Sequence, residues 1–125
     1  REYPTKSEKL QQYYDDRIVG LADATKLSQN PQYSGKWDLV LVNLPHRTIE
    51  FLPDLIPLLN RSNVSLIRGR VIVAESDIPF ANSKINEILP PILAGKPKPE
   101  LKIKRDYSSA LRLCSFEAWI GKDTT

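Results

Sequence analysis

Three segments with the apolar pattern of β-strands each end in a polar side chain that can take part in chemistry. Asp23 follows "RIVGLA", Asn43 follows "WDLVLV" and Glu75 follows "RVIVA". In an open parallel sheet, ligands bind just beyond the carboxyl ends of the strands. The sequence therefore predicts a functional cleft where these three side chains meet, although polar strand ends are also typical of a plain solvated edge.

The segment after the middle strand, "NLPH", has the chemistry best suited to a site. The carboxamide of Asn43 offers a hydrogen-bond donor and an acceptor without carrying charge. Pro45 fixes the direction of the chain and has no backbone N–H, so the strand stops there and presents Asn43. His46 is the only histidine, the residue type that most readily acts as a general base near neutral pH. A lone histidine that opens a helix is more often a surface or capping residue, so no catalytic role is assigned to it.

The composition is that of one globular domain. The chain has 125 residues, of which 41% are hydrophobic and 26% charged, enough for a single domain with a core. No apolar run approaches the roughly 18 residues that cross a bilayer, so no membrane partner is expected. The single cysteine, Cys114, excludes an internal disulfide and a cysteine-based zinc cage and favours a reducing, cytoplasmic setting. Its place in an apolar strand face indicates a small core residue.

Basic residues are distributed unevenly along the chain. The formal net charge is +3 and the pI is near 9.0, values compatible with a nucleic-acid partner. One cluster lies in the middle of the chain and a denser one follows: Arg61, Arg68 and Arg70, then Lys96, Lys98, Lys102, Lys104 and Arg105. Clusters of this kind are more often a plain solvated strand and loop surface than a binding site.

The elements that must position these residues alternate between strands and helices. Continuous apolar character in Trp37–Val42 predicts a strand covered by helices on both faces, and Pro53 and Pro57 predict a broken helix in Arg47–Leu59. The order predicts an α/β fold with a mixed sheet, mostly parallel, and a C-terminal antiparallel hairpin. The other expected elements are a helix at Ser7–Tyr14, a strand at Arg17–Ala24, a helical turn at Thr25–Asn30, a strand at Gly69–Ser76, a helix at Asn82–Leu89 and hairpin strands at Glu100–Tyr107 and Ala110–Ile120.

The stretch "DLVLVNLPH", preceded by "GLADATKL" and followed by "EFLPDLIPLL", resembles the second half of class I S-adenosylmethionine-dependent methyltransferases. It is most similar to the archaeal and eukaryotic tRNA guanine-N1 methyltransferases, whose fourth motif is Asn-Leu-Pro or Asn-Pro-Pro. The ending "RDYSS…CSFEAWI" resembles the sixth and seventh strands of the same fold. The resemblance covers Asp15 to Gly121 and implies a Rossmann-like fold, S-adenosylmethionine as cofactor and RNA, tRNA above all, as substrate. The chain would then be the C-terminal part of a catalytic domain.

The resemblance also implies roles for individual residues. It places Asp23 and the backbone of Ala24 near the adenine of the cofactor and Glu2 at its ribose. Asn43 and Leu44 would lie beside the methyl donor, with Asn43 and Pro45 as the catalytic pair facing the target base. Under the same hypothesis the residues that contact RNA phosphates, each adding to a salt-dependent affinity, are Arg47, Arg61, Arg68, Arg70, Lys96 and Lys98.

The glycine-rich cofactor loop of that family has no counterpart in this sequence. The five glycines are scattered and form no GxGxG cluster, so we expect a preceding segment or another chain to supply the first strands and that loop. Two alternatives remain open. The chain can be a non-catalytic interaction module that keeps the methyltransferase-like fold, or another α/β enzyme that uses Asp23 and Glu75 on a nucleotide or a metal.

Overall fold

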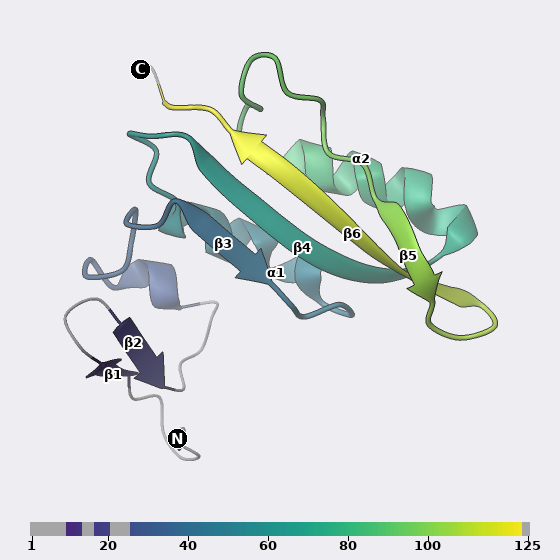
Figure 1. The fold of residues 1–125 in the computed structure, drawn as a ribbon, viewed down its shortest axis with the longest axis horizontal. Coiled ribbons are helices and arrows are strands. Elements are labelled where there is room, and N and C mark those ends of the chain that lie inside the picture. Colours follow the sequence, from purple (N-terminus) through teal and green to yellow (C-terminus); the bar gives the residue numbers. More distant parts are fainter. Residues whose placement is uncertain (1–9, 14–16, 21–25, 124–125) are drawn as a thin grey trace.

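The computed structural model describes residues 10–13, 17–20 and 26–123 (Figure 1). Short 3-10 turns lie at Leu27–Gln29, Ile56–Leu58 and Glu75–Asp77. Within the described residues neither helix has the length and apolar content needed to cross a membrane. The strands and helices in chain order are β1 (Leu10–Tyr13), β2 (Arg17–Gly20), β3 (Leu39–Val42), α1 (Thr48–Leu55), β4 (Ser65–Ala74), α2 (Ile78–Ile88), β5 (Lys102–Asp106) and β6 (Leu111–Ile120).

The main sheet has four strands in the order β3-β4-β6-β5. Strands β3 and β4 are parallel, whereas β6 runs antiparallel to both of its neighbours, β4 and β5. The predicted α/β class, the mixed sheet and the C-terminal hairpin are confirmed. The expectation of a mostly parallel sheet is wrong for the described strands, because β6 inserts between β4 and β5 and leaves a single parallel pair.

The N-terminal elements differ from the prediction. The expected helix at Ser7–Tyr14 is wrong where it can be judged, because Leu10–Tyr13 is a strand that pairs antiparallel with Arg17–Gly20. Leu10 and Tyr13 are three residues apart, a spacing typical of a helix, but four residues are too few to distinguish a helix from a strand by spacing. Aromatic residues such as Tyr13 also favour strands. The predicted strand after Arg17 is confirmed over β2, but β1 and β2 form a sheet of their own.

Both described helices cover the same face of the main sheet, the far face in Figure 1. The side chains of β4 and β6 that point to the helices are buried, among them Ile67, Val71, Phe116 and the predicted core residue Cys114. The opposite face has no helix among the described residues. There Leu39 is 49% exposed and Leu41 66%, so the expectation that this strand is covered on both faces is wrong.

Prolines shape both helices, and the predicted break at Pro53 and Pro57 is confirmed. Pro53 lies inside α1, and the α-helix gives way at Ile56 to a 3-10 turn that contains Pro57. Pro57 has no backbone N–H, so it cannot make the bond that would continue the α-helix. Pro79 stands in the first turn of α2, where a missing N–H goes unused.

Gly69 in β4 lets the sheet accept a large ring from its neighbour. It pairs across the ladder with Phe116 of β6. A Cβ atom at position 69 would lie 2.6 Å from Cε1 of the Phe116 ring and 3.4 Å from Cγ2 of Thr48. The side chain of Phe116 therefore fills the place of the absent one, and this contact joins β4, β6 and the start of α1.

Candidate functional site

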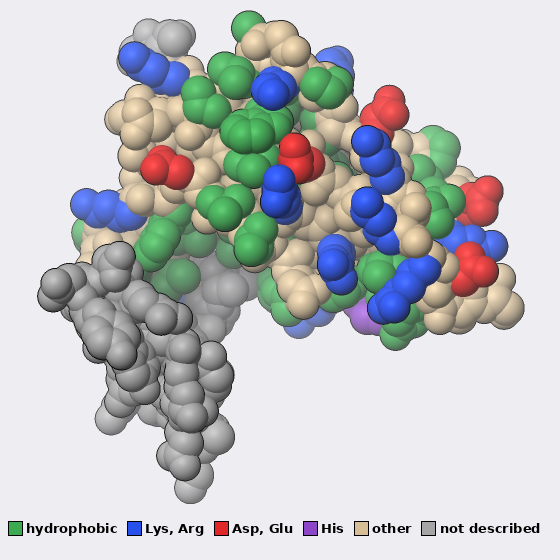
Figure 2. Space-filling view, viewed as in Figure 1, with side chains coloured by type: hydrophobic (Ala, Val, Ile, Leu, Met, Phe, Trp, Pro, Cys, Tyr) green, Lys and Arg blue, Asp and Glu red, His purple; other side chains and the backbone are tan. Residues whose placement is uncertain are grey.

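The uncovered face of the main sheet carries side chains in cross-strand rows, because alternate residues of each strand point to it. The row at one end is apolar, the middle row holds an ion pair, and the row at the other end is cationic. In the register of the strands these rows are Leu39–Leu66–Trp119, Leu41–Arg68–Glu117 and Arg70–Ser115–Lys102. Figure 2 shows hydrophobic side chains gathered over β3 and the adjoining end of this face, and Lys and Arg side chains over β5 and the nearby part of β4.

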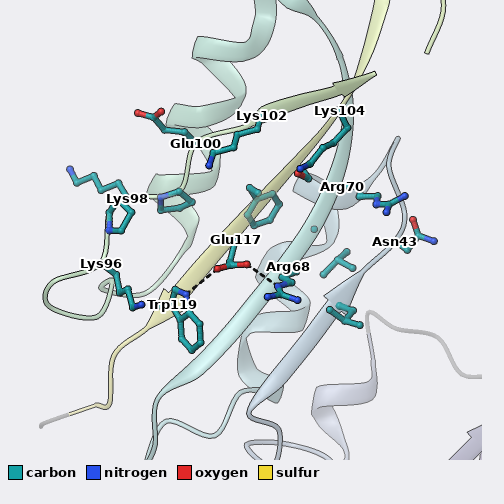
Figure 3. A pocket seen from close by; sticks show the side chains of 17 residues that line it. Asn43, Arg68, Arg70, Lys96, Lys98, Glu100, Lys102, Lys104, Glu117 and Trp119 are labelled. Atoms are coloured by element: carbon teal, nitrogen blue, oxygen red, sulfur yellow. Dashed lines mark hydrogen bonds and ion pairs between the residues drawn. The ribbon is translucent and has the colours of Figure 1, made fainter. Parts of the chain in front are cut away.

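A groove of about 790 Å³ lies over these rows. Its rim on the β5 side is the connector Lys96–Pro99, which follows α2 (Figure 3). Six basic and two acidic side chains line it, a formal excess of four positive charges. The basic ones are Arg68, Arg70, Lys96, Lys98, Lys102 and Lys104, and the acidic ones are Glu100 and Glu117.

The connector is held in place at both ends. Near its start the backbone N–H of Leu93 donates to the carbonyl of Trp119 over 2.9 Å. Near its end Asn82 Oδ1 accepts the N–H of Leu101 at 2.7 Å, and Asn86 Nδ2 donates to the carbonyl of Pro99 at 2.9 Å. These two asparagines of α2 were not singled out in the sequence, yet they fix the rim that carries Lys96 and Lys98.

Glu117 is the central acidic group of the groove. Its carboxylate accepts hydrogen bonds from Arg68 Nε at 2.9 Å and from Trp119 Nε1 at 3.1 Å. The bond from Arg68, together with that from Trp119, lowers the pKa of Glu117 below its usual range. Lys96 Nζ lies 4.9 Å from the centre of the Trp119 ring, so one face of that ring is occupied by a cation.

Four of the six predicted RNA contacts come together in the groove: Arg68, Arg70, Lys96 and Lys98. Two do not. Arg47, directly before α1, pairs with Glu50 at 2.8 Å and lies over Phe51. Arg61 is half-buried in the loop before β4.

Lys102 and Lys104 complete the groove and were missed as site residues. Both belong to the second basic cluster of the sequence. They are two residues apart in "KIK", and this strand alternation could have predicted that they share one face of the sheet. Both lysines belong to the edge strand β5. That strand shifts register between Ile103 and Arg105, and both of its lysines line the groove.

Asn43 lies just past β3, is exposed, and lines the groove at the same end as Arg70 (Figure 3). The chain turns directly after it: the carbonyl of Leu44 accepts the N–H of Arg47 at 2.7 Å, and the carbonyl of Pro45 accepts the N–H of Ile72 at 2.9 Å. Thr48 Oγ1 lies 2.9 Å from the Leu44 carbonyl and 2.6 Å from that of Arg70. This buried hydroxyl ties the turn to β4. Leu44 and Pro45 themselves do not line the groove.

The other predicted site residues lie elsewhere. Glu2, Asp23 and Ala24 are outside the described residues. The Glu75 carboxylate lies 3.5 Å from Arg112 Nε and does not line the groove. His46 packs edge-on against Tyr107, with ring centres 5.4 Å apart. Cys114 is buried in the core, and this burial raises the pKa of its thiol. In the described part of the chain no three His, Cys, Asp or Glu side chains cluster as metal ligands would.

Comparison of the sequence with protein-family models and with curated proteins gives no match. The methyltransferase resemblance therefore rests on the residues quoted for it. The geometry itself offers an open, cationic groove with an aromatic ring at one end and a carboxamide at the other. Such a groove can hold a chain of phosphates and place a neutral group beside one of its units.

Proposed function

We propose that this chain binds RNA on the uncovered face of its main sheet and takes part there in S-adenosylmethionine-dependent methyl transfer to an RNA base. By the sequence resemblance the RNA is tRNA, and this chain supplies the second half of a cytoplasmic, Rossmann-like catalytic domain. The observation that carries the proposal is the convergence of six cations and Asn43 on one groove.

The charge of the groove supports RNA as the partner. Of its six cations, Arg68 is paired with Glu117 and Lys96 lies over Trp119. The other four, Arg70, Lys98, Lys102 and Lys104, form no ion pair among the described residues, and all four are exposed. Cations left without carboxylate partners favour a polyanion, because each phosphate contact releases a condensed counterion.

The position of Asn43 supports the catalytic part. Methyl transfer from a sulfonium is an in-line displacement, so the protein must chiefly align the reactants and accept a proton from the base. A neutral carboxamide just beyond a parallel strand can hold a base edge in place. The antiparallel hairpin of β5 and β6 also agrees with the likeness of this ending to the sixth and seventh strands of the methyltransferase fold.

The missing cofactor loop would come from another chain or segment, which would also bring the first strands. The outer edge of β3 supports this, because no described strand pairs with it. An unpaired strand edge presents free N–H and C=O groups that another strand can use. Cofactor contacts from Glu2, Asp23, Ala24 and Leu44 belong to the same proposal.

A second function is favoured by the apolar end of the same face. Leu39 and Leu41 are exposed, and Trp37 beside them is 37% exposed. An exposed apolar patch often marks a protein contact, so the chain can be a non-catalytic interaction module. Asn43→Ala separates the two functions, because it abolishes methyl transfer in the first and leaves the activity of the module intact in the second.

Salt titration tests the RNA-binding part. Labelled tRNA is titrated with the 125-residue chain at salt concentrations between 0.05 and 0.2 M. Four phosphate contacts predict a slope of about −3 in log affinity against log salt, a weakening of about fiftyfold over that range. Lys102→Ala should make the slope shallower by about 0.7, and Lys36→Ala, which removes the same charge outside the groove, should not. A slope near zero would remove RNA from the proposal.

Methyl transfer is tested separately. The chain, alone and with the segment that precedes it in its parent protein, is incubated with labelled S-adenosylmethionine and tRNA. The expected result is label in RNA when that segment is present, and none for Asn43→Ala at unchanged RNA affinity. RNA binding without any transfer by the longer protein would reject the catalytic part alone.

A further inference from the structure

Trp119 is placed differently from the other large apolar residues of the uncovered face. It lines the groove and is half-buried, and its ring is held in position by the bond from Nε1 to Glu117. Leu66 lies across from it on β4, next to Leu39 on β3. A rigid aromatic ring on a sheet surface, fixed by its neighbours, is a surface on which a flat group can stack.

One face of the Trp119 ring is covered by a long, flexible side chain, that of Lys96. Lys96 Nζ lies 4.9 Å from the ring centre, and Lys96 belongs to the exposed connector at the rim (Figure 3). Base–aromatic stacking is stronger than an exposed cation–π contact. A base can therefore replace the ammonium group, which then lies free to meet the phosphate of the same nucleotide.

We infer that the groove takes single-stranded RNA and that one base stacks on Trp119 in place of Lys96. This inference rests on the proposed RNA binding and adds the form of the RNA and the residue that receives a base. In an RNA duplex the bases are stacked and paired, and proteins reach chiefly the phosphates and the 2′-hydroxyls. Only an unpaired nucleotide can offer a base to Trp119 while its neighbours follow the cations of the groove.

The row spacing places this base away from Asn43. Trp119 and Ser115 of β6 are four residues apart in the ladder with β4, about 13 Å along the strand. The Ser115 row contains Arg70, which lies at the Asn43 end of the groove. The stacked base is therefore not the one that Asn43 faces, and Trp119 would position the strand rather than act on it.

The experiment uses Trp37→Phe, which leaves Trp119 as the only tryptophan. Its fluorescence is followed while the chain is titrated with a single-stranded 12-mer RNA, with a duplex of the same length and with inorganic polyphosphate. We expect the single strand to quench Trp119, and the duplex and polyphosphate to leave it nearly unchanged. If Trp37→Phe does not fold, the difference between wild type and Trp119→Phe reports the same ring.

Affinity gives the second measurement. Trp119→Leu should weaken single-stranded RNA binding roughly tenfold and leave polyphosphate binding within twofold, whereas Trp119→Phe, which can still stack, should retain most of the affinity. RNA binding that neither quenches Trp119 nor responds to Trp119→Leu would overturn this inference and leave the proposed function standing. Binding of no RNA or polyphosphate at all would overturn the proposed function itself.

Discussion

Glu117→Gln should make the chain bind RNA more tightly, an unusual result for a change in a binding groove. The wild-type carboxylate holds Arg68 at 2.9 Å and adds a negative charge to the groove. Glutamine keeps an oxygen that can accept the N–H of Trp119, so the ring stays in place. The substitution therefore removes an anion and frees a guanidinium with little change in shape.

The size of the effect follows from counterion release. A freed Arg68 adds about one phosphate contact, which steepens the slope of log affinity against log salt by about 0.7 for a single strand. If the two proteins bind alike near 1 M salt, one decade of dilution to 0.1 M gives about a fivefold tighter complex for the variant.

The assay is fluorescence anisotropy of a labelled single-stranded RNA between 0.1 and 1 M salt, and Glu100→Gln is the matched control. Glu100 also lines the groove but holds no cation in an ion pair among the described residues. The control therefore removes the same charge without freeing a guanidinium, and its slope should stay at the wild-type value. Equal slopes for Glu117→Gln and wild type, or an equal gain in Glu100→Gln, would refute this reasoning.

Three further predictions concern stability and the rim of the groove. Gly69→Ala should lower the free energy of unfolding, measured in urea titrations, by about 1–3 kcal/mol, because the new Cβ meets the Phe116 ring at 2.6 Å. Adding Phe116→Leu should relieve part of that loss. If the effects of the two substitutions were fully additive, the contact would be contradicted. Asn82→Ala should cost about 1 kcal/mol and also weaken RNA binding, because the connector loses its bond at Leu101; unchanged RNA affinity would show that this anchor does not position the rim. Arg68 lowers the pKa of Glu117, so the ionised pair stabilises the fold fully above the ordinary glutamate pKa of 4.5, and this stabilisation is lost as the pH falls through the lower folded-state pKa. The difference in unfolding free energy between wild type and Glu117→Gln should therefore shrink below about pH 4.5. A difference that grows with falling pH would contradict the pairing.

Much of the fold was predictable because local patterns agree with it. The hairpin of β5 and β6 follows from strict alternation, in which Cys114, Phe116, Ala118 and Ile120 form one buried face. The break after α1 follows from Pro53 and Pro57. These features depend on residues a few positions apart, which is the range over which sequence patterns are most informative.

The arrangement of the strands was less predictable because it depends on distant pairings. Continuous apolar character in Trp37–Val42 indicated a strand buried on both faces, yet one face of β3 is open in the described structure. Apolar residues on both sides of a strand do not show whether both faces are covered by helices of the same chain or one face stays exposed.

The candidate site was predicted in part. Arg68 and Arg70 could be placed on one face because they are two residues apart in a strand. Lys96 and Lys98 reach the same groove on a connector that is tied down by Asn82 and Asn86 of α2 and by the backbone bond from Leu93 to Trp119. Such bonds between segments far apart in sequence leave no local pattern. The position of Trp119 at the end of the groove likewise depends on the pairing of β6 with β4, which no local pattern predicts.

The most direct test of RNA binding on the uncovered sheet face is a comparison of two double charge reversals. Arg70→Glu with Lys102→Glu reverses two groove cations, and Lys36→Glu with Lys84→Glu makes the same change in net charge outside the groove. RNA affinity at 0.1 M salt should fall about 25-fold or more in the first protein, from two lost contacts, and only slightly in the second. Equal losses in the two proteins, or no loss in the first, would contradict the account.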